Sequence, residues 1–138
     1  MQGADNQPLF LYIFLIMKGG LLMKFKIKGE ETKLKMGIKF IRLLDEIYRI
    51  DYQGLDFGMG VMYAQIGLNQ KSVPTLSDVI RCGLGNDFTQ DEVDEAVENF
   101  AEENSLSKLF EQVEQALGKS KVVQETMEGL RKAQESVK

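Results

Sequence analysis

MKFKIKGEETKLKMGIKFIRLLDEIYRI, residues 23–50, changes its hydrophobic period part-way along. Up to residue 36, apolar side chains alternate with lysines on both sides of a Gly29-Glu30-Glu31 turn. Alternation with period two around a turn predicts a β-hairpin with one apolar and one basic face. Two strands alone are marginal in water, so this hairpin is expected to lie on helices. Its apolar positions are Phe25, Ile27, Leu34 and Met36.

From Gly37 onward the apolar residues recur with helical spacing and form one wide stripe. Charged residues fall opposite the stripe, with Arg42 and Glu46 one helical turn apart. Gly54 is the first strong stop signal, so this helix is expected to end there. The stripe consists of Phe40, Ile41, Leu43, Leu44, Ile47, Tyr48 and Ile50.

The next segment, Phe57 to Leu68, has the length of a helix but no polar side. Such a helix is either fully buried or reserved for a partner. It contains two methionines, whose flexible side chains fill both cores and adaptable binding surfaces. We expect core packing for these methionines, with a partner-binding surface as the alternative interpretation. The candidate contact residues are Phe57, Met59, Met62, Tyr63 and Ile66.

Three further helices are predicted from their start signals: one near Pro74, one at the capping box of Thr89 and Glu92, and one from Ser105 to Gly118. Residues 119–138 have few apolar positions, which favours a frayed or partner-stabilised helix. The expected fold is mainly α, a compact helical domain of about five helices with a small N-terminal β-hairpin. The expected organisation is an N-terminal extension (1–22), a helical domain with its hairpin (23–117) and a C-terminal helical tail (118–138).

The N-terminal extension differs from the rest because Leu9 to Met17 is an unbroken apolar and aromatic run. As a helix this run would cover about 14 Å of the roughly 30 Å hydrocarbon core of a bilayer, so no membrane span is expected. Lys18-Gly19-Gly20 back-translates to a purine-rich run of the kind that recruits bacterial ribosomes ahead of Met23. Met23 is therefore a hypothetical native start. The alternative is that the chain begins earlier and that Leu9 to Met17 forms a strand or helix buried in the fold or in a neighbouring subunit.

The composition argues against enzymatic chemistry. The chain has no histidine and a single cysteine, Cys82, which removes the common nucleophile–base pairs, most zinc sites and any intrachain disulfide. The acidic run from Asp91 to Glu103 and the two Gly-x-Gly sequences, Gly58-Met59-Gly60 and Gly83-Leu84-Gly85, lack metal-binding or phosphate-binding patterns. We expect a solvated helix face and close-packing or hinge glycines there, with no cofactor, no metal and no catalytic residue.

Charge is distributed unevenly along the chain. Residues 89–138 hold twelve acidic and six basic residues, while the lysines gather on the predicted hairpin. Such a cluster allows an alternative function, a small regulatory or nucleic-acid-binding protein that uses the lysine-rich hairpin. The overall charge of −4 argues against that alternative.

Four stretches carry a family resemblance: MKFKIKGE from Met23, LKMGIKFIRLLDEIY from Leu34, QGLDFGMG from Gln53 and LSDVI from Leu76. Together they resemble the tail assembly chaperones of siphophages, in particular the tape-measure protein chaperone of lactococcal-type bacteriophages. The similarity covers roughly Met23 to Leu117, and residues 1–22 lie outside the family pattern.

The resemblance implies a non-enzymatic chaperone that binds the hydrophobic tape-measure protein, keeps it soluble, and helps tail-tube subunits polymerise around it. It also implies action in the host bacterial cytoplasm and absence from the mature virion. Several members of such a family have a longer form made by ribosomal frameshifting. Because many copies would coat one long client, we expect a homo-oligomer, either a ring or a spiral.

Overall fold

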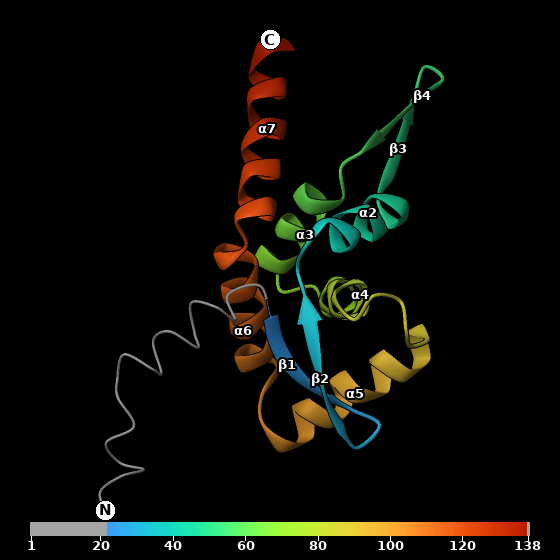
Figure 1. The fold of residues 1–138 in the computed structure, drawn as a ribbon, viewed down its shortest axis with the longest axis vertical. Coiled ribbons are helices and arrows are strands. Elements are labelled where there is room, and N and C mark those ends of the chain that lie inside the picture. Colours follow the sequence, from blue (N-terminus) through green and yellow to red (C-terminus); the bar gives the residue numbers. More distant parts are fainter. Residues whose placement is uncertain (1–21, 138) are drawn as a thin grey trace, which may run out of the picture.

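The computed structural model describes residues 22–137, and the side chains of that range except those of residues 22, 50, 52, 55–57 and 137. It is mainly helical with an N-terminal β-hairpin, as predicted, and the described range holds six helices rather than about five. The predicted extension, its apolar run and the question of the native start lie outside the described residues, apart from Leu22. Figure 1 shows the elements in order: β1 (Leu22–Ile27), β2 (Glu30–Lys35), α2 (Ile38–Ile47), β3 (Arg49–Tyr52), β4 (Leu55–Gly58), α3 (Gly60–Asn69), α4 (Val73–Gly83), α5 (Gln90–Glu103), α6 (Leu106–Lys119) and α7 (Lys121–Val137).

The β1–β2 hairpin forms as the alternation predicts, but its turn lies at Lys28 and Gly29, and Glu30 and Glu31 of the predicted turn belong to β2. Its two-residue turn, Lys28 and Gly29, has positive φ at both positions (53° and 82°), which matches the twist of antiparallel strands. One face is buried and packs on α4, α5 and α6, and the other face exposes lysines. The buried residues are the predicted four: Phe25, Ile27, Leu34 and Met36.

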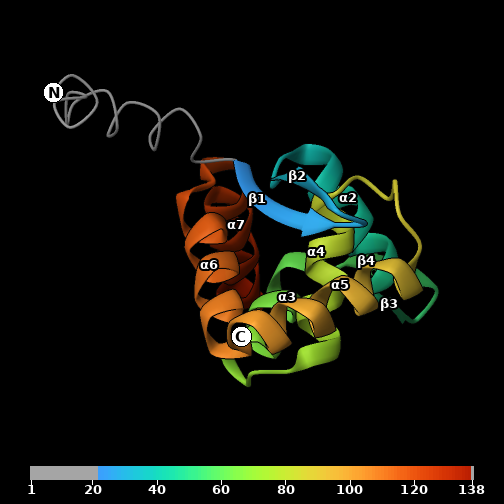
Figure 2. The same cartoon turned by 90° about the horizontal axis from the view of Figure 1, so that it is seen from below.

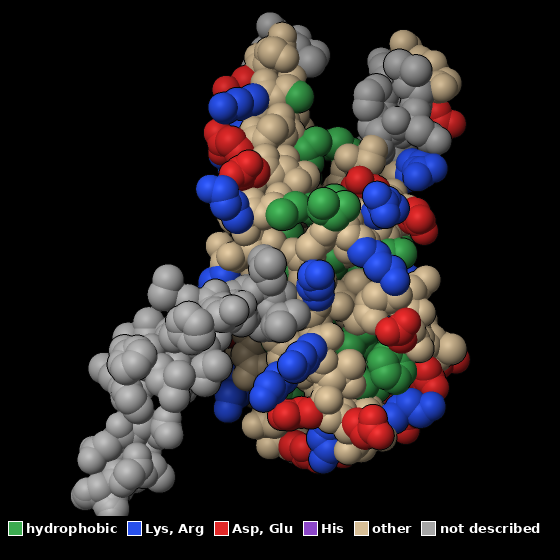
Figure 3. Space-filling view, in the orientation of Figure 1, with side chains coloured by type: hydrophobic (Ala, Val, Ile, Leu, Met, Phe, Trp, Pro, Cys, Tyr) green, Lys and Arg blue, Asp and Glu red, His purple; other side chains and the backbone are tan. Residues whose placement is uncertain are grey.

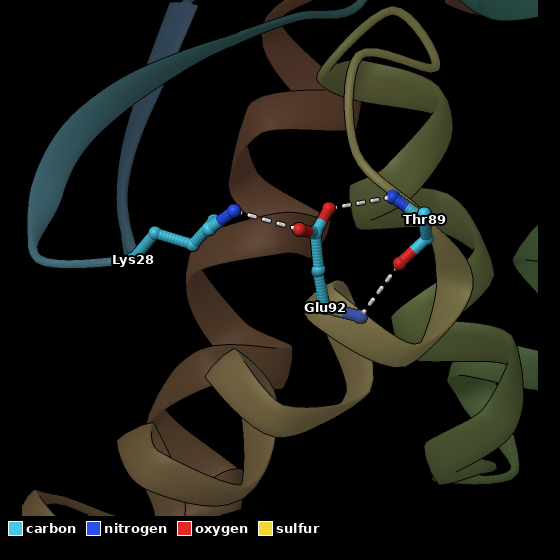
Figure 4. Close-up of polar contacts among 3 residues, drawn as sticks. All are labelled: Lys28, Thr89 and Glu92. Carbon is cyan, nitrogen blue, oxygen red and sulfur yellow. Dashed lines mark hydrogen bonds and ion pairs between the residues drawn. The ribbon is translucent and has the colours of Figure 1, made fainter.

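The tip of this hairpin is tied to the start of α5 (Figure 4). Lys28 Nζ lies 2.8 Å from Glu92 Oε2, while Glu92 Oε1 accepts a 2.9 Å hydrogen bond from the backbone N–H of Thr89. Thr89 Oγ1 accepts from the backbone N–H of Glu92 at 3.1 Å, so the predicted capping box is confirmed. Glu92 therefore serves both the helix start and the hairpin turn.

The prediction for residues 48–58 is wrong. Helix α2 ends at Ile47, and a second hairpin, β3–β4, follows in place of a helix that continues to Gly54. Gln53 and Gly54 form its turn with φ of 53° and 81°, repeating the geometry of the first hairpin. Apolar residues at 47, 48 and 50 satisfy helical and strand spacing equally, and the two-residue turn decides the outcome. Phe57 accordingly lies in β4 rather than in the following helix.

Helices α4, α5 and α6 begin where their start signals predict. Ser72 and Ser105 cap α4 and α6, accepting from the backbone N–H groups of Thr75 and Lys108. Their apolar faces close a single core together with the hairpin and α2. Its largest fully buried side chains are Phe40, Ile27, Leu34, Met36, Leu44, Leu68, Leu76, Ile80 and Leu109.

The C-terminal segment is one continuous helix, α7, which stacks with α6 into a column along one side of the molecule (Figure 1). Its first turns pack on the domain through Val123, which is fully buried, and Met127. Residues 131–136 are all exposed. In Figure 1 this outer part of α7 and the β3–β4 hairpin, called the β3–β4 arm below, project from the same end of the molecule.

Candidate binding surface

The start of α3 is held tightly against α2. The backbone N–H of Gly60 donates a 2.9 Å hydrogen bond to Asp45 Oδ1, so a side chain of α2 satisfies one of the free amides at the helix start. A Cβ added at Gly60 would lie 2.4 Å from the carbonyl carbon of Leu44, and one at Gly58 would lie 2.6 Å from Asp45 Cγ. These two glycines thus allow close packing, in agreement with the reading of the sequence.

Helix α3 has a buried face and an exposed apolar face. Val61, Ala64 and Leu68 lie in the core, as the spacing of the segment predicts. The opposite side, called the α3 strip below, is apolar as well, although it is open to solvent. It consists of Met59 and Met62, which are half-buried, and Tyr63 and Ile66, which are 42% and 47% exposed.

Four of the five candidate contact residues are therefore brought together on one surface. Met59 is the N-cap of α3, and Met62, Tyr63 and Ile66 lie within the helix. Phe57 precedes them in β4, and its side chain is not among those that the structure describes. Nothing in the fold itself covers the strip fully, which is unusual for a helix with so few polar residues.

Aromatic side chains support one edge of the α3 strip. The rings of Tyr48 and Tyr63 lie 6.3 Å apart at 33°, within the range of favourable aromatic pairs. The Tyr48 hydroxyl donates a 2.8 Å hydrogen bond to Asp78 Oδ2 on α4. Burial, followed by the hydrogen bond and negative charge of Asp78, raises the pKa of Tyr48 well above its usual value. This ring is consequently a fixed, neutral wall between α2, α3 and α4.

Helix α7 borders the other edge of the α3 strip. Gln134 Nε2 lies 3.6 Å from the Met62 sulfur, and Leu130 of α7 is half-buried like Met127. Figure 3 shows apolar side chains in the hollow between the two projections of the molecule, α7 and the β3–β4 arm. We call this hollow the trough. The contribution of α7 was not predicted, although Val123, Met127 and Leu130 share helical spacing.

The potential metal ligands among residues 22–137 are the carboxylates and Cys82. No set of three or more Cys, Asp or Glu side chains there is placed to hold a metal ion. Cys82 is 1% exposed, and burial raises the pKa of its thiol to about 12. It therefore packs as a small apolar residue, as expected from the sequence. None of the described helices combines the length and apolar composition required to span a bilayer.

A family model described as phage tail assembly chaperone protein, TAC, matches residues 24–132 of the chain. The chain belongs to this family of phage tail assembly chaperones. The match includes α2, α3 and α7 as far as residue 132, so the α3 strip, Met127 and Leu130 all lie within it. Comparison with curated proteins and with solved structures gives no match.

Family membership confirms the resemblance seen in the sequence and gives the protein a role in the assembly of phage tails. A tail assembly chaperone requires a tail protein as its partner. The trough is a surface of the described chain where apolar side chains from separate elements meet in the open. It is therefore the candidate for contact with that partner.

Proposed function

We propose that this tail assembly chaperone binds the tape-measure protein in the trough and keeps it soluble until the tail tube forms around it. The client segment would be an apolar or amphipathic helix that lies along the α3 strip. Helix-in-groove binding uses apolar side chains at i, i+3 and i+4 on the incoming helix. The tail-tube protein would be a second, later partner.

The observation that carries this proposal is the exposure of Tyr63 and Ile66 beside a complete core. Transfer of a large apolar side chain from water to a packed site contributes about 1.5–3 kcal/mol, so these two half-exposed side chains offer a client roughly 2 kcal/mol. A monomer gains nothing from leaving them open. Met59 and Met62 beside them adapt to different shapes, which suits a client with a long and varied sequence.

We infer further that the protein acts by binding alone and performs no chemical reaction. The absence of histidine from the whole sequence supports this, as does the high pKa of its only thiol. Action in the host cytoplasm, release before the virion is complete, and a siphophage source are parts of the same proposal. Several copies would act on one client, since a single trough covers only a short part of a long polypeptide.

Co-expression with the tape-measure protein tests the proposal directly. The client is expected to move from the insoluble to the soluble fraction and to co-purify with the chaperone. The variant Tyr63→Asp/Ile66→Asp should lose most of this effect, because two carboxylates would have to be buried under the client. Ile38→Asp is the control for a carboxylate added outside the trough, since Ile38 is 64% exposed at the far end of α2 from Tyr48.

Circular dichroism and thermal unfolding of both variants separate lost binding from lost folding. Full rescue of the client by a folded Tyr63→Asp/Ile66→Asp variant would place the contact outside the α3 strip. Equal loss with Ile38→Asp would show a general effect of added charge. An insoluble client in the presence of abundant, folded wild-type chaperone would remove the tape-measure protein from the proposal.

A further inference from the structure

We propose that copies of the chaperone associate head-to-tail, with the lysine face of one copy seated on an acidic cleft of the next. The lysine face is the outer side of the β1–β2 hairpin, where four exposed lysines outnumber one carboxylate, Glu31, which stands opposite Lys26: Lys24, Lys26, Lys33 and Lys35. The acidic cleft lies between α4 and α5, with Val73, Pro74 and Val97 as its apolar lining and Asp78, Asp94 and Glu98 as its carboxylates. The inference rests on the self-association part of the proposed function and names its interface.

The lysine face carries charge that the monomer does not use. Lys24 and Lys33 stand directly opposite each other in the strand register, and like charges in such a pair repel. None of the four lysines forms an ion pair with any carboxylate of residues 22–137. Binding of an anionic surface to this face would offset the repulsion between Lys24 and Lys33.

The acidic cleft supplies such a surface. It has a volume of about 310 Å³ and combines an apolar lining with carboxylates. Asp94 is held in place, since Oδ1 accepts from Gln90 Nε2 at 3.0 Å and from the Ser77 hydroxyl. Lysine side chains bury their methylene stems on apolar surface and keep the ammonium group at a polar rim. The cleft therefore fits lysine side chains in both respects.

The spacing of the two sets of charges also agrees. Alternate residues of a strand, such as Lys24 and Lys26, lie about 6.6 Å apart. Residues four apart on a helix, such as Asp94 and Glu98, lie about 6 Å apart. Glu102 extends the same row of α5 by one more turn and is exposed. Two lysines of one strand can therefore meet two successive carboxylates of the helix.

The two surfaces lie on different sides of the molecule, so one copy cannot satisfy itself. Figure 2 shows the β1–β2 hairpin along one side and the α3–α4 connection, which leads into Val73 and Pro74, along the other. A contact between two unlike patches on opposite sides is heterologous and repeats from copy to copy. Such a contact gives a ring if the rotation closes and an open spiral if it does not.

Sedimentation velocity of the full chain, without client, tests the interface. Self-association of the wild type should rise with concentration and weaken at high salt, because exposed charges are screened. Lys24→Glu/Lys33→Glu and, separately, Glu98→Lys/Glu102→Lys should each weaken association by about tenfold or more through like-charge contact. The variant that carries all four changes should regain association, because both surfaces are then reversed together.

Lys108→Glu/Lys132→Glu and Glu111→Lys/Glu135→Lys are the matched controls, since they change net charge equally at exposed positions of α6 and α7. They should associate like the wild type. A monomeric wild type at every concentration overturns the proposal, and so does unchanged association in either paired variant. Loss in both without recovery in the fourfold variant overturns it as well.

Nucleic-acid binding is the competing use of the lysine face. Loss of RNA or DNA binding in Lys24→Glu/Lys33→Glu with unchanged self-association would assign the face to that use and overturn the proposal. Because client is absent from these measurements, failure here is distinct from failure of client capture. Capture depends on the α3 strip, which none of these substitutions alters.

Discussion

The Ser120 hydroxyl donates a 2.7 Å hydrogen bond to the backbone carbonyl oxygen of Met36, which lies 84 residues earlier in the chain. The Ser120 hydroxyl oxygen in turn accepts a 3.2 Å hydrogen bond from the backbone N–H of Val123. Ser120 is fully buried at the junction of α6 and α7, and Met36 follows the first hairpin. One hydroxyl thus joins the start of α7, a wall of the trough, to the body of the domain.

Replacing Ser120 with Ala should lower the free energy of unfolding by about 2 kcal/mol, because a buried carbonyl and a helix N-cap lose their partner together. Ser105→Ala is the control, since Ser105 caps α6 in the same way but is exposed. That control should cost about 1 kcal/mol or less. Urea denaturation measures both, and equal losses would contradict a special role for the buried contact.

Gly60→Ala should destabilise the protein by about 2 kcal/mol or more, because backbone atoms of Leu44 occupy the space that its methyl group needs. Gly129→Ala is the control: an added Cβ meets nothing within 4 Å there, in the middle of α7. Helix propensity predicts a gain of roughly 0.5–1 kcal/mol at that position. A tolerated Gly60→Ala, measured by the same denaturation, would mean that α3 does not depend on this close approach.

Leu130→Asp should reduce capture of the tape-measure protein by α7 without unfolding the domain, because Leu130 lies beyond the fully buried Val123 and borders the trough. Lys132→Asp is the control, since Lys132 is exposed two residues later. Co-purification of client, divided by the amount of folded chaperone, gives the comparison. Indistinguishable capture by the two variants would exclude α7 from the contact.

The stability contributed by the Lys28–Glu92 ion pair should fall at both low and high pH, because the pKa values of its two groups are shifted in opposite directions. The side-chain hydrogen bond from Lys28, followed by the Thr89 backbone N–H, holds the pKa of Glu92 below its usual value. The hydrogen bond to Glu92 raises the pKa of Lys28. Stabilisation from Glu92 is therefore present above its unfolded pKa and is lost as pH falls through the folded one. For Lys28 it is present below the unfolded pKa and is lost as pH rises through the folded one.

Carbon-detected NMR titration of Lys28→Met checks this assignment. The pKa of Glu92 should rise toward its ordinary value but should stay below it, because the Thr89 amide still donates to the carboxylate. A Glu92 titration that is identical in wild type and variant would contradict the pairing.

Cys82 should resist thiol reagents in the native protein at pH 8. Burial raises its pKa to about 12, against about 8.5 for an exposed thiol, so little reactive thiolate forms. The protonated thiol therefore stabilises the folded state at pH values below the pKa of the unfolded thiol. This stabilisation is lost as pH rises through the pKa of the folded thiol. Labelling in increasing urea should follow unfolding measured by circular dichroism. Rapid labelling without urea would contradict the burial.

The sequence contains enough information for the first hairpin and for α4, α5 and α6, because each has a local signal. Alternating lysines mark the hairpin, and Thr89 with Glu92 marks the start of α5. The β3–β4 arm was missed since Ile47, Tyr48 and Ile50 satisfy both helical and strand spacing. Only the pairing of residues 49–52 with 55–58 resolves that ambiguity, and this pairing is seen only in the folded structure.

The candidate site shows the same division. The α3 strip is visible in the sequence, because a helix-length segment without polar residues needs a second partner for its second face. The wall formed by α7 is not visible, since Gln134 meets Met62 across 72 residues of chain. Lys28 and Glu92, 64 residues apart, are likewise joined only by the fold.

The bond from the Gly60 amide to Asp45 anchors the start of α3 on α2, beside the close approach of Gly58 in β4 to the same side chain. The base of the arm therefore lies beside this hydrogen bond, which involves no residue of the turn at the tip of the arm. Extra residues inserted at Gln53 and Gly54 would lengthen one side of the trough and leave its floor undisturbed. Such insertions would change the solvent-exposed tip of the arm and leave the buried core of the domain unchanged.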